Sequence, residues 1–316
     1  MKLFYTLFIS FFIHGTFVSS QKTIIDSLAK KAGIESSAKN YLSAIKIYTQ
    51  ITEKEPTDSK YWFYRGQAYM KVNDFKHAEP DYNKAIQLNS KYFDAYLSRA
   101  ILYFNLNDAE KSVNDYNQAL RYCSDESMNV FIRNNRGNAK MLRNDNAGAY
   151  DDFMKAYEID NQSTTTLSNL GNVLNILNRG EEALNFYEKV AAKDSTNLDA
   201  LNNVGYTLLN LNRFEEAKNR FDKVLLVQSN QPMSLSNRAL CFFNLHDDKN
   251  ALADIDKAIQ LYPDYAYAYR NRGIIYVSQK RFSEGCPDFQ SAIKLGFTKL
   301  FDTEVEELLV RYCEEK

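Results

Sequence analysis

The chain of 316 residues repeats itself about every 34 residues, and this period limits the folds that it can adopt. A small residue recurs at position 8 of each period, and a large apolar residue recurs at position 24. The small residues are Ala32, Gly66, Ala100, Gly137, Gly171, Gly205, Ala239 and Gly273. The large residues are Tyr48, Tyr82, Tyr116, Phe153, Tyr187, Phe221, Ile255 and Phe289. A helical hairpin of this length cannot bury its own apolar face, so neighbouring units must stack on each other.

The unit at residues 59–92 shows the pattern most clearly. It places Trp62, Gly66, Tyr69, Ala78, Tyr82 and Ala85 at positions 4, 8, 11, 20, 24 and 27. These spacings resemble the tetratricopeptide repeat, a helix–turn–helix unit. The resemblance implies an all-α fold, a right-handed α-solenoid (superhelix) of eight hairpins within residues 21–299. The expected repeats are residues 25–58, 59–92, 93–126, 130–163, 164–197, 198–231, 232–265 and 266–299.

Residues 1–20 form a separate segment with the pattern of a secretory signal peptide. Lys2 precedes an apolar run from Leu3 to Ile13, and small residues follow up to Ser20. The run is short for a bilayer span. We expect cleavage before Gln21 and a periplasmic or secreted protein without a membrane span. An uncleaved anchor and a cytosolic amphipathic segment are the alternatives.

Two further segments depart from the repeat. The three extra residues between repeats 3 and 4 fall within residues 123–129, where we expect a longer loop. At the other end, residues 300–316 contain the stripe Val305, Leu308, Leu309 and Tyr312, spaced as one face of a helix. We expect this helix to cap the last repeat, with a partner-binding amphipathic helix as the alternative.

Composition and charge argue against several functions. The formal net charge is −1, with no basic run of the kind that nucleic-acid binding needs. The chain has three histidines and no phosphate-binding or nucleophile motif, so we expect no enzymatic activity, no metal site and no cofactor.

Two repeat positions change together. Position 7 is arginine in five repeats (Arg65, Arg99, Arg136, Arg238 and Arg272), and position 23 is aspartate in the same five (Asp81, Asp115, Asp152, Asp254 and Asp288). Where position 7 is Lys31, Leu170 or Val204, position 23 is not aspartate. This covariation predicts structural Arg–Asp ion pairs across each hairpin. A ligand-binding arginine ladder is the alternative.

Four cysteines in an exported chain suggest a disulfide bond. Cys286 lies in the last second helix, and Cys313 lies near the end of the expected capping helix. Cys123 and Cys241 lie three repeats apart, too far to bond in a solenoid. We therefore predict a Cys286–Cys313 disulfide, with four buried free thiols as the alternative.

The resemblance also suggests a binding site. In the family, the first helices line a concave face, and asparagine at position 6 often holds the backbone of a bound peptide, the alternative being that it serves only the hairpin. The matching residues are Asn135, Asn169, Asn203, Asn237 and Asn271, with Asn138 and Asn172 at position 9. An amide both donates and accepts hydrogen bonds, which suits a peptide group. The main hypothesis is a non-enzymatic scaffold of the cell envelope that binds an extended peptide or partner protein on this face. The alternatives are a structural subunit that uses its convex face or ends, and a glycan-recognition module.

Overall fold

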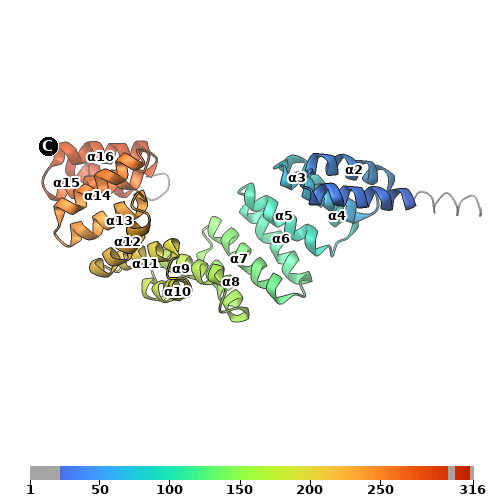
Figure 1. Cartoon of the computed structure of the whole chain (residues 1–316), viewed down its shortest axis with the longest axis horizontal. Helices are drawn as coiled ribbons and strands as arrows, with labels where there is room; N and C mark the ends of the chain where they lie inside the picture. The colour runs from blue at the N-terminus through green and yellow to red at the C-terminus, as the bar shows by residue number, and fades with distance from the viewer. Residues whose placement is uncertain (1–21, 298–302, 314–316) are drawn as a thin grey trace, which may run out of the picture. The chain divides into compact units, whose positions relative to one another are not determined.

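The computed structural model describes residues 22–297 and 303–313. Within these residues the regular secondary structure is entirely helical (Figure 1). The expected signal peptide, residues 1–20, lies outside the described residues, as do residues 300–302 and 314–316 of the expected cap.

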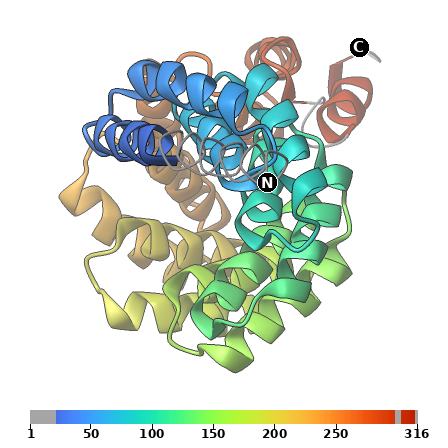
Figure 2. The same ribbon diagram turned by 90° about the vertical axis from the view of Figure 1, so that its right-hand side faces the viewer.

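The helices pair into the hairpins that the period predicts, and Figure 2 shows the same hairpins from a second direction. In repeat 1, residues 22–37 are helical and pack against α2 (Tyr41–Lys54). The later hairpins are α3 (Ser59–Lys71) with α4 (Phe75–Leu88), α5 (Phe93–Asn105) with α6 (Ala109–Tyr122), α7 (Glu126–Leu142) with α8 (Asn146–Ile159), α9 (Thr164–Ile176) with α10 (Gly180–Lys193), α11 (Leu198–Asn210) with α12 (Phe214–Val227), α13 (Pro232–Asn244) with α14 (Asp248–Leu261), and α15 (Ala266–Ser278) with α16 (Phe282–Lys294). Helix α18 (Glu304–Cys313) follows the last hairpin.

The chain divides into two compact units, unit 1 (Met1–Asp160) and unit 2 (Asn161–Lys316). In unit 1, consecutive helices from α2 to α8 pack on each other in chain order, and α3 also contacts α5. In unit 2, the same holds from α9 to α16, and α13 also contacts both α11 and α15. These additional contacts join first helices of neighbouring repeats.

The turn inside each hairpin contains one residue with a left-handed backbone. These eight residues occupy position 15 and have φ between 58° and 64°: Lys39, Asn73, Asn107, Asn144, Asn178, Asn212, His246 and Lys280. Asparagine tolerates this conformation because its short polar side chain can bond locally, which explains why position 15 is so often asparagine.

In seven repeats the next residue, at position 16, begins the second helix in one of two ways, whereas in repeat 1 it is Asn40, whose side chain makes no capping hydrogen bond. In four repeats it is an aspartate (Asp74, Asp108, Asp145 or Asp247), whose side chain accepts a hydrogen bond from the N–H three residues later. In three repeats it is an arginine, which pairs with a glutamate in the first helical turn: Arg179–Glu182, Arg213–Glu216 and Arg281–Glu284. Both solutions place a carboxylate near the positive end of the helix dipole.

In several hairpins, a glycine of the first helix faces a ring of the second helix at short range. A Cβ atom on Gly137 would lie 2.3 Å from the Phe153 ring, and a Cβ atom on Gly171 would lie 2.5 Å from the Tyr187 ring. Both rings are almost completely buried. The small residue at position 8 therefore makes room for the ring at position 24, as the period predicts.

The three inserted residues do not lengthen the loop, so that expectation was wrong. Helix α7 has 17 residues and starts at Glu126, four residues before the expected start of repeat 4. The side chain of Asp125 accepts a hydrogen bond of 2.7 Å from the N–H of Met128. Because Asp125 caps the helix there, the insertion forms an extra turn of α7 instead of loop.

The C-terminal helix packs on the last repeat. Val305 is buried, and Leu308, Leu309 and Tyr312 pack against the same cluster, which includes Phe289 of α16. A disulfide bond joins Cys286 in the second turn of α16 to Cys313 in the last turn of α18, with the two Cα atoms 5.9 Å apart. The bond thus links the ends that two antiparallel helices bring together.

Candidate partner-binding face

All five Arg–Asp pairs are present. In each, the guanidinium Nε and Nη2 donate to the two carboxylate oxygens sixteen residues later. The donor–acceptor distances are 2.6–2.9 Å for Arg65–Asp81, Arg99–Asp115, Arg238–Asp254 and Arg272–Asp288, and Arg136 makes the same two bonds to Asp152. Hydrogen bonding to Asp288 raises the pKa of Arg272 above its usual value. The contact that covariation predicts is therefore a forked, charge-assisted pair.

Each of these arginines also bonds to the preceding repeat. The third donor, Nη1, reaches the side chain at position 25 of the previous second helix. The acceptors are Thr49 for Arg65, Asn83 for Arg99, Asn117 for Arg136, Asp222 for Arg238 and Asp256 for Arg272. The arginines therefore join neighbouring repeats, and with all three donating nitrogens bonded they act as structural links. The sequence carried a signal for this, because position 25 is polar before every arginine repeat.

The predicted asparagine ladder is only partly available for binding. Asn135, Asn138, Asn169, Asn203 and Asn237 are half-buried, and Asn172 is exposed. The amide of Asn135 donates to the carbonyl of Phe131 at 2.8 Å, and Asn172 accepts from the Tyr187 hydroxyl.

Asn271 must be removed from the ladder. It is only 2% exposed, its amide nitrogen donates to Ser236 at 3.0 Å, and its oxygen accepts from Arg270 at 2.8 Å. Because both ends of the amide are engaged, Asn271 links α15 to α13 and is not free to hold a peptide.

The structure shows further polar links between first helices that were not predicted. The amide of Asn175 donates to the Thr207 hydroxyl at 2.9 Å, joining α9 to α11. The hydroxyl of Ser234 donates to Asn202, joining α13 to α11. Among the described residues, every fully buried side-chain nitrogen and oxygen has a hydrogen-bond partner. Polar residues at positions 3, 5, 10 and 12 of a first helix were the signal for these links.

Four residues of unit 2 form a surface that we call the amide–aromatic face: Asn203 and Tyr206 on α11, and Met233 and Asn237 on α13. Each pair is three or four residues apart and so lies on one side of its helix, and the two helices are in contact. Tyr206 is 45% exposed and Met233 is 52% exposed. The face therefore offers amide donors and acceptors beside accessible apolar surface.

Residues 22–297 and 303–313 contain no group of three His, Cys, Asp or Glu side chains placed to hold a metal ion. Over the same residues, the helices are too short or too polar to cross a bilayer.

Comparison with known proteins supports the repeat assignment. Models of the tetratricopeptide repeat family match residues 59–92, 93–126 and 176–234. Serine/threonine-protein phosphatase 5 of Homo sapiens is 38% identical over 63 residues, and the Rattus norvegicus protein matches equally. This match covers 20% of the present chain and only 13% of the phosphatase.

Solved structures share the fold at low sequence identity. The Cut9–Hcn1 hetero-tetramer of the APC/C aligns with a TM-score of 0.57 at 17% identity, covering 78% of this chain and 48% of that chain. The C-terminal part of a TPR repeat-containing protein from Cytophaga hutchinsonii aligns with a TM-score of 0.57 at 16% identity, covering 77% of this chain and 98% of that chain. The period, the stacked hairpins and these matches show that the chain is built from tetratricopeptide repeats, which indicate a scaffold for protein–protein interaction.

Proposed function

We propose that the protein is a non-enzymatic scaffold that binds an extended segment of a partner protein on the amide–aromatic face. The observation that carries the proposal is the pair Asn203 and Asn237, which occupy the same repeat position on two contacting helices. Their side-chain amides form no hydrogen bond with other described residues, unlike the amide of Asn271.

The neighbouring side chains favour an extended segment with apolar residues. Amides at regular spacing can bond to a peptide backbone whatever its side chains, and this provides affinity without strong sequence selection. Tyr206 and Met233 add exposed apolar area, and both residue types are common at the centre of protein interfaces.

Site-specific photo-crosslinking tests this proposal. A photoreactive amino acid at Tyr206 should capture a partner from extract, and Asn203→Ala with Asn237→Ala should lower that yield by about tenfold or more. Stability should change by less than about 1 kcal/mol, since both side chains are only half-buried and their amides form no hydrogen bond with described residues. Asn219→Ala, at an exposed residue of α12, is the matched control and should leave the yield unchanged. An undiminished yield in the stable double variant would contradict binding at these amides.

We also propose that the protein works outside the cytosol, in the cell envelope or secreted. The Cys286–Cys313 disulfide supports this, because such bonds persist mainly in oxidising compartments. The signal-peptide pattern of residues 1–20 supports it independently. N-terminal sequencing of the protein from its native host tests the location, with Gln21 as the expected first residue and Met1 as the contrary result.

A second candidate, assembly through the second helices, is favoured by Leu226 on α12. This side chain is 87% exposed and borders a pocket of about 290 Å³ between α12, α13 and α14. The equivalent residue is Gln87 in repeat 2 and Gln260 in repeat 7, so the leucine departs from the pattern of the chain. The same photoreactive amino acid, placed at Leu226, tests this candidate. Capture of a partner at Leu226 but not at Tyr206 would favour it, provided that substitutions of pocket residues other than Leu225 abolish the capture.

A further inference from the structure

In four repeats, the position-7 arginine lies against aromatic rings of its own first helix. The guanidinium carbon is 4.8–5.8 Å from the ring centroids. The contacts are Arg65 with Trp62, Arg99 with Tyr96 and Tyr103, Arg238 with Phe242, and Arg272 with Tyr269 and Tyr276. An aromatic face attracts a cation without adding charge. The hairpin then needs only its one aspartate to balance the arginine.

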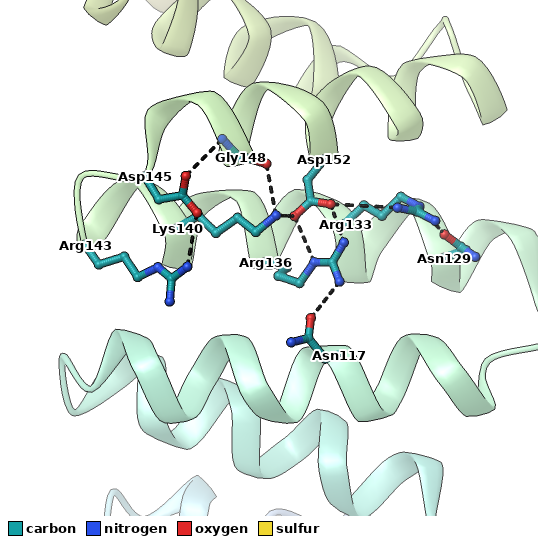
Figure 3. A network of polar contacts seen from close by, with 9 residues as sticks. All are labelled: Asn117, Asn129, Arg133, Arg136, Lys140, Arg143, Asp145, Gly148 and Asp152. Atoms are coloured by element: carbon teal, nitrogen blue, oxygen red, sulfur yellow. Dashed lines mark hydrogen bonds and ion pairs between the residues drawn. The ribbon is translucent and has the colours of Figure 1, made fainter.

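These aromatic residues occupy positions 4 and 11 of their repeats, and repeat 4 has a cation at both positions. Arg133 stands at position 4 and Lys140 at position 11, on either side of Arg136 along α7 (Figure 3). Lys140 Nζ lies 2.8 Å from Asp152 Oδ2, and Arg133 Nη1 lies 3.7 Å from Asp152 Oδ1. Arg136 donates two hydrogen bonds to the same carboxylate. Three cations therefore share one carboxylate, which leaves two positive charges unbalanced.

Nearby acidic residues do not restore the balance. Asp145 is engaged by Arg143 and by the N–H of Gly148 (Figure 3). Glu158 acts on Arg133 through space, but the two form no hydrogen bond or ion pair among the described contacts. The excess charge is also poorly solvated, because the three cationic side chains are only 15–21% exposed. Like charges in such a place repel one another more strongly than in water.

Arg133 is the member with unused donors. Its Nε donates to Asn129 at 2.7 Å, whereas its two terminal nitrogens form no hydrogen bond with the described residues. Burial and repulsion from Arg136 lower the pKa of Arg133. A guanidinium held beside like charges, whose outer fork makes one ion pair of 3.7 Å and no hydrogen bond, is suited to an incoming anion.

We propose that Arg133 and Lys140, with the charge of Arg136 between them, form a binding site for a doubly charged oxyanion beside the α7–α8 hairpin. The charge of a phosphate group at neutral pH, close to −2, matches the two unbalanced cations. The fork of Arg133 supplies paired donors for two oxygens, and the Lys140 ammonium supplies a point charge. The ligand is phosphate or sulfate, either free or as a group on a larger molecule. The site lies in unit 1, apart from the amide–aromatic face, and does not depend on the function proposed for that face.

Equilibrium dialysis of the full chain with labelled inorganic phosphate tests the site directly. We expect one phosphate per chain, displaced by sulfate, and at least about tenfold weaker binding in Arg133→Leu with Lys140→Tyr. These residues restore types that other repeats carry at positions 4 and 11, so the variant should melt at the same temperature as the wild type or higher in chloride buffer. Tyr96→Leu, at position 4 of repeat 3, is the matched control and should bind phosphate normally.

Binding measurements with a second ligand and a second variant identify the class of ligand and cover the case in which the double variant does not fold. Equal binding of phenyl phosphate would indicate a phosphate group on a larger molecule, and its exclusion would indicate the free anion. If the double variant does not fold, Arg133→Gln alone should still weaken binding, because it removes the outer fork. Absence of phosphate and sulfate binding at millimolar concentration would overturn the proposal, as would binding that is equal in folded wild type and variants, or preference for acetate over both dianions.

Discussion

Arg220 of α12 donates a hydrogen bond of 2.8 Å to Glu188 of α10, so repeats 5 and 6 are joined by an ion pair whose arginine comes from a second helix. In five other repeats, the arginine comes from position 7 and the residue at position 23 is aspartate. In repeat 6, position 7 is Val204, and position 23 itself supplies the arginine. The acceptor is still position 25 of the preceding repeat. The link between repeats is therefore retained while its cation moves from the first helix to the second.

The Arg–Asp pairs can be tested with residues that the chain itself uses. Arg99→Leu should destabilise the protein by about 3 kcal/mol, because it leaves the buried Asp115 without its partner. Adding Asp115→Phe should recover most of the loss, because repeat 5 carries Leu170 and Phe186 at these positions. Urea denaturation measures both changes. Equal losses in the single and the double variant would contradict the pairing.

Because some glycines lie against a ring and others do not, the effect of a glycine-to-alanine substitution on stability should depend strongly on which glycine is replaced. Gly137→Ala should cost about 1–3 kcal/mol, because the new methyl group would collide with the buried Phe153 ring. Gly33→Ala is the matched control: a Cβ atom there meets nothing within 4 Å, and alanine is the better helix former. It should stabilise by about 0.5–1 kcal/mol. Thermal melts of the two variants should therefore shift in opposite directions.

The cysteines should react in three distinct steps. Cys123 is partly accessible, while Cys241 is fully buried and its burial raises its thiol pKa to about 12. Alkylation of native protein at pH 8 should label Cys123 alone, denaturation should add Cys241, and reduction should add Cys286 and Cys313. Intact-mass spectrometry counts the labels. Four labels on denatured, unreduced protein would exclude the disulfide.

The aspartate cap of α6 predicts a pH dependence. Contacts with Lys111 lower the pKa of Asp108 in the folded protein, so its stabilising effect is complete above the ordinary aspartate pKa of about 3.9. It is lost as the pH falls through the lower, folded-state pKa. Asp108→Ala should cost about 1 kcal/mol at pH 7, and this difference from wild type should shrink below pH 4.

Asn114→Ala, an exposed change on the same helix, is the control for the cap and should show no such trend. A difference between wild type and Asp108→Ala that stays constant down to pH 2 would mean that the carboxylate charge contributes nothing at this helix end.

The sequence predicted the hairpins well because each is defined by residues close together in the chain. Position 8 and position 24 determine the contact inside a hairpin, and the covariation of Arg99 with Asp115 reports a contact in the same unit. The third bond, from Arg99 to Asn83, belongs to two repeats, so a search within one period does not reveal it.

The binding residues were harder to predict for a physical reason. Asn237 and Asn271 occupy the same position of the repeat, yet only the second is buried. The difference comes from neighbours: Asn271 meets Ser236 of the preceding repeat and Arg270 beside it. Burial at this position therefore depends on pairs of repeats, which the pattern of a single repeat does not encode. The extra turn of α7 depended in the same way on one capping residue, Asp125.

The disulfide changes how the end of the chain can open. In a stack of hairpins, the terminal helix normally frays first, because it has a neighbour on one side only. Here Cys313 is held to Cys286, so α18 remains tethered to the second turn of α16 even when its noncovalent contacts break. Rapid reclosing should give the amide hydrogens of α18 exchange protection close to that of α16. In reduced protein, the amide hydrogens of α18 should exchange fast, whereas those of α16 should still exchange slowly.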